Sequence, residues 1–213
     1  SGIGNLYCLN AQTGINVWSF DMVKDLGGRF TLFGQAESPL IDGDQVFLTP
    51  GGVDNNVVSL NRFTGKLNWA CKGFGEIPGY NSPVMINLPS VKILVTFSAY
   101  HLMGIDAETG KLLWSHEQIN VPPAERKPGM GDTHSNSAYY ENGFIYYVAG
   151  DNNCGTKLKL SDDGKQITQL WNNKAVDNYM GGFIKIDIRI YTGSESIRSV
   201  ICADAISGKV IDS

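Results

Sequence analysis

The residues best suited to chemistry stand in one run, Gly131-Asp132-Thr133-His134-Ser135-Asn136, after a stretch rich in Pro and Gly. A carboxylate, an imidazole and hydroxyl groups so close together can exchange protons or hold a polar ligand. No Gly-x-Ser-x-Gly occurs, and spacing alone assembles no Ser-His-Asp set, so the run predicts ligand contacts before it predicts a nucleophile. The alternative that stays open is structural, because short polar side chains also cap loops and satisfy backbone groups.

Similar polar residues precede other segments that we expect to be the innermost strands of repeated units. If those segments surround one axis, their polar starts form a ring that can line a central site. The carboxylates that could serve as catalytic bases there are Glu37 and Asp132. The residues that we expect to contact a ligand are Ser38, Asn81, Ser82, His134, Ser135, Asn136, Asn178 and Met180.

The sequence predicts no metal site. The acidic runs Asp151-Asn152-Asn153 and Asp162-Asp163 lack the Gly and the terminal Glu of an EF-hand loop, so we interpret them as turns. His101 and His116 stand alone, without the Cys or His partners of a zinc site.

The element that must position these residues is a turn, seen most clearly from Asp106 to Trp114. An apolar strand leads to Asp106, Gly110 closes the turn, and a return strand carries Trp114. An Asp side chain can accept hydrogen bonds from the backbone two residues on, and Gly can take the positive φ that the turn needs. This stretch therefore predicts a hairpin.

Five copies of this turn occur along the chain. Their glycines are at positions 14, 65, 110, 164 and 208, with the fourth copy looser than the rest. All four Trp residues of the chain follow these turns, namely Trp18, Trp69, Trp114 and Trp171, while Asp212 takes the fifth place. A repeat of about 40–50 residues with four strands in each unit is typical of a β-propeller.

Composition and charge restrict the class of protein further. The 213 residues are 42% hydrophobic and 18% charged, which is enough to build a core and excludes disorder. A net charge of −4 argues against a nucleic-acid partner. No apolar run of about 18 residues is present, so we expect no transmembrane segment. No signal peptide is visible, but the chain opens inside a repeat, and we expect an upstream segment.

The four Cys residues form no Cys-x-x-Cys motif and no adjacent pair. We predict free and mostly buried thiols.

We predict an all-β fold in which residues 1–213 form one β-propeller domain or fragment with four-stranded antiparallel blades. About four and a half blades are present, and we expect them to belong to a seven- or eight-bladed ring, because half a blade does not close a ring of four. Association between chains and a compact rearranged ring remain the alternatives. Residues 117–133 form a loop insertion, and a short helical turn is expected near Met22–Leu26. The units span about 1–20 (partial), 34–73, 78–118, 134–174 and 178–213.

The turn pattern, as in Ile105-Asp106-Ala107-Glu108-Thr109-Gly110 with Trp114, resembles the repeat of quinoprotein alcohol dehydrogenase-like (PQQ-like) propellers. In that family each Trp docks between neighbouring blades. The stretches Ala36–Gly43, Thr49–Gly52, Leu158–Gly164 and Met180–Gly182 look like a bacterial secreted, polyvinyl-alcohol-dehydrogenase-like subgroup. This resemblance implies a periplasmic or extracellular location.

The resemblance leaves two hypotheses for function. The first is a propeller that binds a small molecule, carbohydrate or protein at the channel mouth and has no chemistry of its own. The second is an alcohol or sugar dehydrogenase that depends on pyrroloquinoline quinone (PQQ) and calcium, or a remnant of one. The vicinal disulfide that true quinoprotein dehydrogenases carry is missing, because no two Cys residues are adjacent. We favour the first hypothesis and leave open whether the protein is an enzyme.

Overall fold

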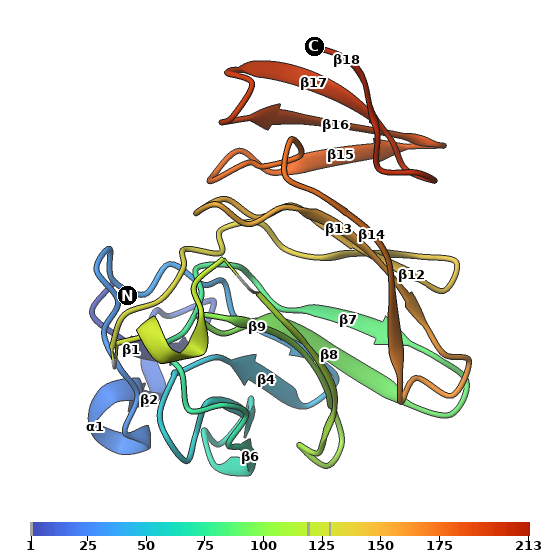
Figure 1. The fold of residues 1–213 in the computed structure, drawn as a ribbon. Helices are drawn as coiled ribbons and strands as arrows, with labels where there is room; N and C mark the ends of the chain where they lie inside the picture. Colours follow the sequence, from blue (N-terminus) through green and yellow to red (C-terminus); the bar gives the residue numbers. More distant parts are fainter. Residues whose placement is uncertain (1, 119, 128) are drawn as a thin grey trace.

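β-Strands joined by tight turns make up nearly all regular structure in the computed structural model, which describes residues 2–118, 120–127 and 129–213 (Figure 1). The exceptions are helix α1 (Met22–Leu26), as expected from the sequence, and one turn of 3₁₀-helix (Pro123–Glu125). None of the described helices has the length and apolar character needed to cross a membrane.

The strands form five sheets, in which each strand pairs antiparallel with its neighbour in sequence. We call the sheets blades 1 to 5. Blade 1 contains β1 (Asn5–Leu9) and β2 (Asn16–Asp21). Blade 2 contains β3 (Leu40–Asp42), β4 (Gln45–Leu48), β5 (Val57–Asn61) and β6 (Leu67–Cys71). Blade 3 contains β7 (Val84–Asn87), β8 (Lys92–Phe97), β9 (His101–Asp106) and β10 (Leu112–Glu117). Blade 4 contains β11 (Tyr139–Glu141), β12 (Phe144–Tyr147), β13 (Gly155–Leu160) and β14 (Ile167–Asn173). Blade 5 contains β15 (Phe183–Ile186), β16 (Arg189–Ser194), β17 (Ser199–Asp204) and β18 (Val210–Asp212).

The predicted all-β fold with four-stranded antiparallel blades is therefore confirmed, and the blades correspond to part of a propeller. In Figure 1 the sheets follow one another from the blue first blade at the lower left to the red last blade at the top.

The turn between the third and fourth strands has the chemistry expected from its residues. In blade 3, Asp106 Oδ1 accepts hydrogen bonds from the backbone N–H groups of Glu108 (2.9 Å) and Thr109 (3.1 Å), and Gly110 has a φ of 74°. The amide of Gly110 closes the turn on the carbonyl oxygen of Asp106 at 2.8 Å. Asn10, Asn61 and Asp204 accept the equivalent pairs of hydrogen bonds in blades 1, 2 and 5.

The fourth turn differs, because its Gly stands one position earlier. The amide of Gly164 bonds to the carbonyl oxygen three residues back, at Ser161, whereas the other turn glycines bond four residues back.

A register shift after each of these turns places the four Trp residues at equivalent positions. Trp18 pairs across the hairpin with Cys8, Trp69 with Ser59, Trp114 with Gly104 and Trp171 with Lys157. A bulge turns the strand locally and re-aims the side chain that follows it.

The core is divided into seams, each of which lies between two consecutive blades. One seam packs Phe47 and Val57 of blade 2 against Leu94 and Ile105 of blade 3, with the half-buried Trp69 beside them. Similar clusters join blades 1 and 2, blades 3 and 4, and blades 4 and 5. The hydrophobic effect therefore stabilises the contact of one blade with the next more than it stabilises any single sheet.

Three of the four indoles also donate a hydrogen bond across their seam. Trp18 Nε1 donates to the carbonyl oxygen of Arg62 (2.8 Å), Trp69 Nε1 to that of Ala107 (2.9 Å), and Trp171 Nε1 to that of Ala205 (3.2 Å). Each acceptor lies in the tight turn of the next blade, one residue after the Asn or Asp that begins it. One such bond contributes about 1 kcal/mol to stability.

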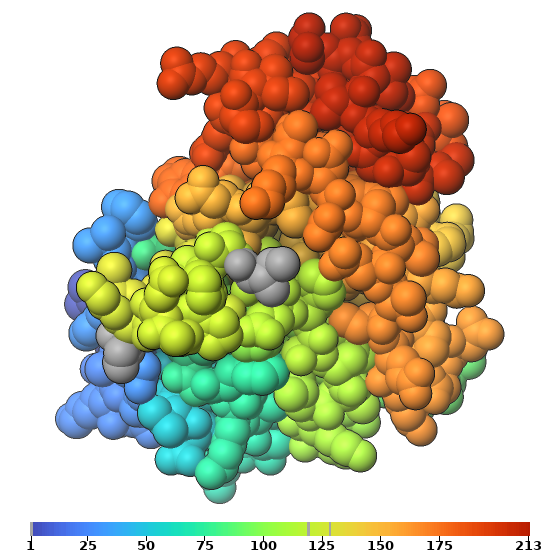
Figure 2. Space-filling model, in the orientation of Figure 1, coloured from blue at the N-terminus to red at the C-terminus, as the bar shows by residue number. Residues whose placement is uncertain are grey.

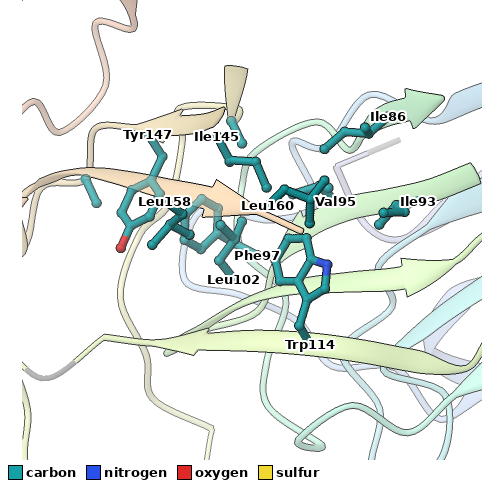
Figure 3. Close-up of a cluster of buried hydrophobic side chains, with 12 residues drawn as sticks. Ile86, Ile93, Val95, Phe97, Leu102, Trp114, Ile145, Tyr147, Leu158 and Leu160 are labelled. Carbon is teal, nitrogen blue, oxygen red and sulfur yellow. The ribbon is translucent and has the colours of Figure 1, made fainter. Parts of the chain in front are cut away.

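Trp114 lies in the seam between blades 3 and 4 without such a bond. Its indole is only 6% exposed and packs with Val95, Leu160 and their neighbours (Figure 3), while its Nε1 has no hydrogen-bond partner. Two observations explain why this bond is missing. The turn of blade 4 closes over three residues instead of four. Gly104, which pairs with Trp114 across the hairpin, has no side chain, so the indole folds back over its own blade.

The two end blades each have one apolar face that no other described blade covers. On blade 5, Ile184 is 64% exposed and Val200 is 73% exposed, and on blade 1 Tyr7 and Val17 are each more than half exposed. Among the described residues no hydrophobic cluster joins blades 1 and 5, so the described blades form an open arc. The size of the complete ring stays a prediction.

All four Cys residues are free thiols, as expected. Only Cys71 is fully buried, and the other three are half-buried.

Candidate functional site

A cavity of about 660 Å³ lies where the loop insertion meets the loops that lead into the first strands of the blades. Its lining includes residues 30–33, residues 129–133 at the end of the insertion, and residues 151–152 in a turn. Ile77, Tyr80, Asn120, Val121 and Tyr179 complete it. Figure 2 shows the yellow-green insertion at the surface, beside the blue N-terminal segments. We call this space the insertion cavity.

Two carboxylates form the polar side of the insertion cavity. Asp132 is 7% exposed, and its Oδ2 accepts a hydrogen bond from Asn153 Nδ2 at 2.9 Å. Asp151 is half-buried, and its Oδ2 accepts the backbone N–H of Thr133 at 2.5 Å. Burial raises the pKa of both side chains above 3.8, and the charge of Asp132 raises the pKa of Asp151 further. The cavity therefore holds negative charge that is only partly compensated.

Several apolar side chains that line the insertion cavity are open to solvent. Leu32 is 87% exposed, Phe33 is 61% and Met130 is 62% exposed, while Phe30 is more than half exposed. The ring of Phe33 lies 5.9 Å from that of Tyr80, and the Tyr80 hydroxyl accepts the backbone N–H of Phe33 at 3.2 Å. Large apolar side chains gathered at the mouth of a cavity are typical of an interaction surface.

His134 lies beneath the insertion cavity and does not line it. The residue is 2% exposed, its ring stacks on Phe97 at 4.4 Å, and its Nε2 is 3.0 Å from the carbonyl oxygen of Ala99. Its Nδ1 is buried without a partner. Burial lowers the pKa of His134 to about 4, so the imidazole is neutral at pH 7, and an Nε2–H donating to Ala99 suits this geometry.

The polar residues Asn136 and Asn178, which precede the first strands of blades 4 and 5, bond to the loops and strands around them. Asn136 Nδ2 donates to the carbonyl oxygens of Val148 (3.0 Å) and Asn178 (2.8 Å), and its Oδ1 accepts the N–H of Gly182 (2.8 Å). Asn178 Nδ2 donates to Thr192 Oγ1 at 3.0 Å. The Asn136 side chain therefore joins blade 4 to the loop that leads into blade 5, whereas the Asn178 side chain bonds within blade 5.

Serine residues in the loops before the first strands of blades 2, 3 and 4 also bond to one another. Ser82 Oγ accepts the backbone N–H of Ser38 at 3.2 Å, and the carbonyl oxygen of Ser82 accepts Ser137 Oγ at 2.7 Å. Asn81 is buried and donates weakly to Thr96 Oγ1 at 3.4 Å, whereas its Oδ1 has no partner. The loops into successive first strands thus lie side by side, as a common axis requires.

The remaining predicted contacts are more peripheral. Ser135 is half-buried between His134 and Asn136, and Met180 is 60% exposed. Neither lines the insertion cavity.

The structure separates the two carboxylates that the sequence paired as candidate bases. Glu37 lies in a smaller cavity of about 260 Å³ between blades 1 and 2, whereas Asp132 lines the insertion cavity. Both carboxylate oxygens of Glu37 accept the backbone N–H of Thr49, at 2.9 and 3.0 Å. Burial raises the pKa of Glu37 to about 8, so it is mostly protonated at pH 7.

Sequence reasoning missed several residues of the insertion cavity. Phe33, Tyr80 and Tyr179 come from three different inter-blade loops, and no local motif connects them. The sequence predicts a turn at Asp151, and its positive φ of 56° agrees with that prediction, but Asp151 also lines the insertion cavity.

Comparison with known proteins supports the same fold. BamB from Moraxella catarrhalis aligns over 99% of this chain and 58% of its own, with 12% identity and a TM-score of 0.66. Quinohemoprotein alcohol dehydrogenase from Comamonas testosteroni aligns over 99% of this chain and 40% of its own (16% identity, TM-score 0.60). The C-terminal domain of PilY1 from Pseudomonas aeruginosa aligns over 98% and 58% (13% identity, TM-score 0.61).

At these identities the alignments establish a shared fold only. The chain spans well under two thirds of the BamB and dehydrogenase chains that it matches. No curated protein sequence matches it. A family model, however, matches residues 1–212. The chain therefore belongs to the PQQ-like propeller family described as outer membrane protein assembly factor BamB.

Proposed function

We propose that this propeller is a bacterial binding scaffold that works in the periplasm or outside the cell and holds a protein partner at the insertion cavity. The observation that supports this most directly is the exposed rim of Leu32, Phe33 and Met130 around the 660 Å³ cavity. Exposed apolar side chains cost free energy in a lone protein, and covering them with a partner recovers it. The family description, an assembly factor, agrees with a role in protein contacts.

The rim residues that the sequence singled out support the cavity in this proposal. Asn136 joins blade 4 to the loop before blade 5, and Asn178 bonds that loop to Thr192 of blade 5, so the loops that carry Asp132 and Tyr179 are held against rigid sheets. Rigid elements beneath a binding surface reduce the entropy lost on binding. Ser38, Asn81, Ser82, Ser135, His134 and Met180 remain proposed ligand contacts.

A small molecule or carbohydrate is the alternative occupant of the insertion cavity, whose volume lies within the range of ligand pockets. We favour a protein because the apolar side of the cavity opens widely to solvent instead of enclosing a ligand.

The second candidate is a PQQ- and calcium-dependent dehydrogenase, for which Asp132 is the acid or base to consider because burial raises its pKa. The residues do not fit this cofactor pair well. The four thiols are free and none is adjacent to another, and both oxygens of Glu37 face Thr49 in a separate cavity. The described residues include no group of three or more His, Cys, Asp or Glu able to hold a metal ion. The polyvinyl-alcohol-dehydrogenase-like resemblance likewise stays a proposal.

Site-specific photo-crosslinking in the source organism tests the scaffold. A photoreactive phenylalanine analogue at position 32 should form an adduct with a protein, whereas the same analogue at Ile206, 64% exposed in the turn of blade 5, should not. Equal crosslinking at both positions would argue against a partner at the insertion cavity.

Isothermal calorimetry tests the hypothesis of a dehydrogenase that depends on PQQ and calcium. PQQ and calcium chloride titrated into the protein should give no heat of binding if the chain is a scaffold. Binding with turnover of alcohols would replace our proposal with the second candidate.

A further inference from the structure

We infer that the insertion cavity receives a cationic side chain, Lys or Arg, from the partner, while apolar residues beside that side chain cover the rim. This inference rests on the proposed function and specifies the chemistry of the partner. It follows from three features of the cavity: its carboxylates, its aromatic lining and the exposed apolar residues around it.

The first feature is negative charge that is only partly compensated. Asp132 and Asp151 line the cavity, and the hydrogen bonds that they accept come from neutral groups. Asn153 and Asn120 donate to Asp132, and Thr133 donates to Asp151. The raised pKa of each side chain shows that burial disfavours its charge more than these bonds favour it. A cation placed between the two carboxylates would compensate their negative charge.

Arg126, a cation of this chain near Asp132, does not neutralise the two aspartates. Arg126 lies close enough to lower the pKa of Asp132, but its guanidinium is committed elsewhere. Its Nη1 is 2.8 Å from Glu117 Oε1, and it donates to the carbonyl oxygens of Val121 (3.1 Å) and Gln118 (2.8 Å). The guanidinium also stacks over the ring of Tyr100 at 4.3 Å.

The second feature is the aromatic lining. Phe30, Phe33, Tyr80 and Tyr179 line the same cavity as the two carboxylates. Aromatic faces attract ammonium and guanidinium groups through the ring quadrupole, and the attraction grows when the cation is desolvated. Carboxylates combined with aromatic rings favour an organic cation that carries a hydrocarbon stem.

The third feature is the rim. The mouth exposes Leu32, Phe33 and Met130, which would pack on the stem of a Lys or Arg and on apolar residues beside it. A bare divalent ion would leave these side chains uncovered. A protein segment covers them and satisfies the aspartates together.

Calorimetry with three matched probes, in the presence of EDTA, tests the inference. The probes are 4-phenylbutylamine, 4-phenylbutan-1-ol and 4-phenylbutyrate, which share a stem and differ in charge. The wild-type protein should bind the amine at least about tenfold more tightly than the alcohol and should not bind the carboxylate, since charge-assisted contacts are made only with the amine. Asp132→Asn and Asp151→Asn should each reduce this preference to about threefold or less.

The matched control is Asp163→Asn, which makes the same change in an exposed turn outside the cavity and should keep the full preference. Circular dichroism establishes that the variants are folded. Because Asp151 is the less buried of the two aspartates, its variant keeps the test valid if Asp132→Asn does not fold.

The other outcomes would contradict the cationic partner, the binding site itself or the absence of a metal. If the amine and the alcohol bind equally, and Leu32→Ser weakens both, the cationic partner is wrong but the binding surface stands. If none of the probes binds, the insertion cavity is not a binding site and the proposed function fails as well. If calcium chloride alone, without EDTA, binds and Asp132→Asn removes that binding while the amine does not bind, the cavity is a metal site and our inference is wrong.

Discussion

The indole of Trp69 lies directly over the turn glycine of the next blade, Gly110. A Cβ added at Gly110 would be 2.6 Å from Cε3 of the indole, closer than real Cβ contacts come. The same relationship joins Trp18 to Gly65 and Trp171 to Gly208. Each of these turn glycines therefore has two roles, because it adopts a positive φ and also leaves room for the indole of the preceding blade.

Gly110→Ala separates these two roles when it is compared with Gly143→Ala. Both positions have positive φ, 74° and 83°, but a Cβ at Gly143 would meet nothing within 4 Å. We expect Gly143→Ala to lower the free energy of unfolding by about 1 kcal/mol through backbone strain. Gly110→Ala should cost about 2 kcal/mol or more, because the indole must also move. Urea unfolding measures both, and equal costs would show that the indole contact does not matter.

Gly104→Ala tests the unusual position of Trp114. A Cβ at Gly104 would be 2.0 Å from Cε2 of the indole, although the backbone there tolerates Ala. We expect a loss of about 1–3 kcal/mol from overpacking. In a Trp114→Phe background the same change should cost much less, and a double-mutant cycle measures the difference.

Gly193→Ala is the control for this cycle. Its nearest neighbour would be Asn178 Nδ2 at 3.6 Å, which is ordinary contact, so its effect should be close to zero. An unchanged cost of Gly104→Ala in both backgrounds would contradict our account of Trp114.

Glu37→Gln tests the protonation of the half-buried Glu37 carboxyl group. Its pKa rises from 4.5 to about 8 on folding, so the folded state binds the proton more tightly than the unfolded state does. The stability that this provides is present below pH 4.5 and is lost progressively between pH 4.5 and pH 8. Gln stays neutral, so the variant should gain at least about 1 kcal/mol relative to wild type between pH 5 and pH 8. Urea unfolding across this range checks the sign, and parallel curves would show that Glu37 is ionised in the folded protein.

His134 should remain neutral down to acidic pH. Its pKa falls from 6.5 to about 4 on folding, so the unfolded state takes up the proton first, and stability decreases as the pH falls from about 6.5 to about 4. Nuclear magnetic resonance of the protein with ¹⁵N-labelled His should show one imidazole that titrates near pH 4. His134→Gln identifies that signal by removing it, and a value near 6.5 for His134 would contradict its buried position.

Local chemistry accounts for what the sequence alone determined. The Asp or Asn that begins each turn bonds to the next few backbone amides, and the Gly takes a positive φ, so each hairpin can be predicted from about ten residues. Repetition of that hairpin predicts the four-stranded blades, since one blade cannot bury its apolar faces without the next.

Only the tertiary structure decided which polar residues are committed to the fold and which remain at a cavity. Asn136 and Asp132 look equivalent in the sequence. Asn136, however, bonds to the loop before blade 5, whereas Asp132 lines the insertion cavity together with Asp151 and the aromatic residues of distant loops. Likewise, Trp114 and Trp69 occupy the same position after their turns, but only Trp69 donates to the next blade, to the carbonyl oxygen of Ala107, which lies 38 residues away. Such differences depend on the shape of a neighbouring blade, and local propensity carries no information about a partner that only packing brings into contact.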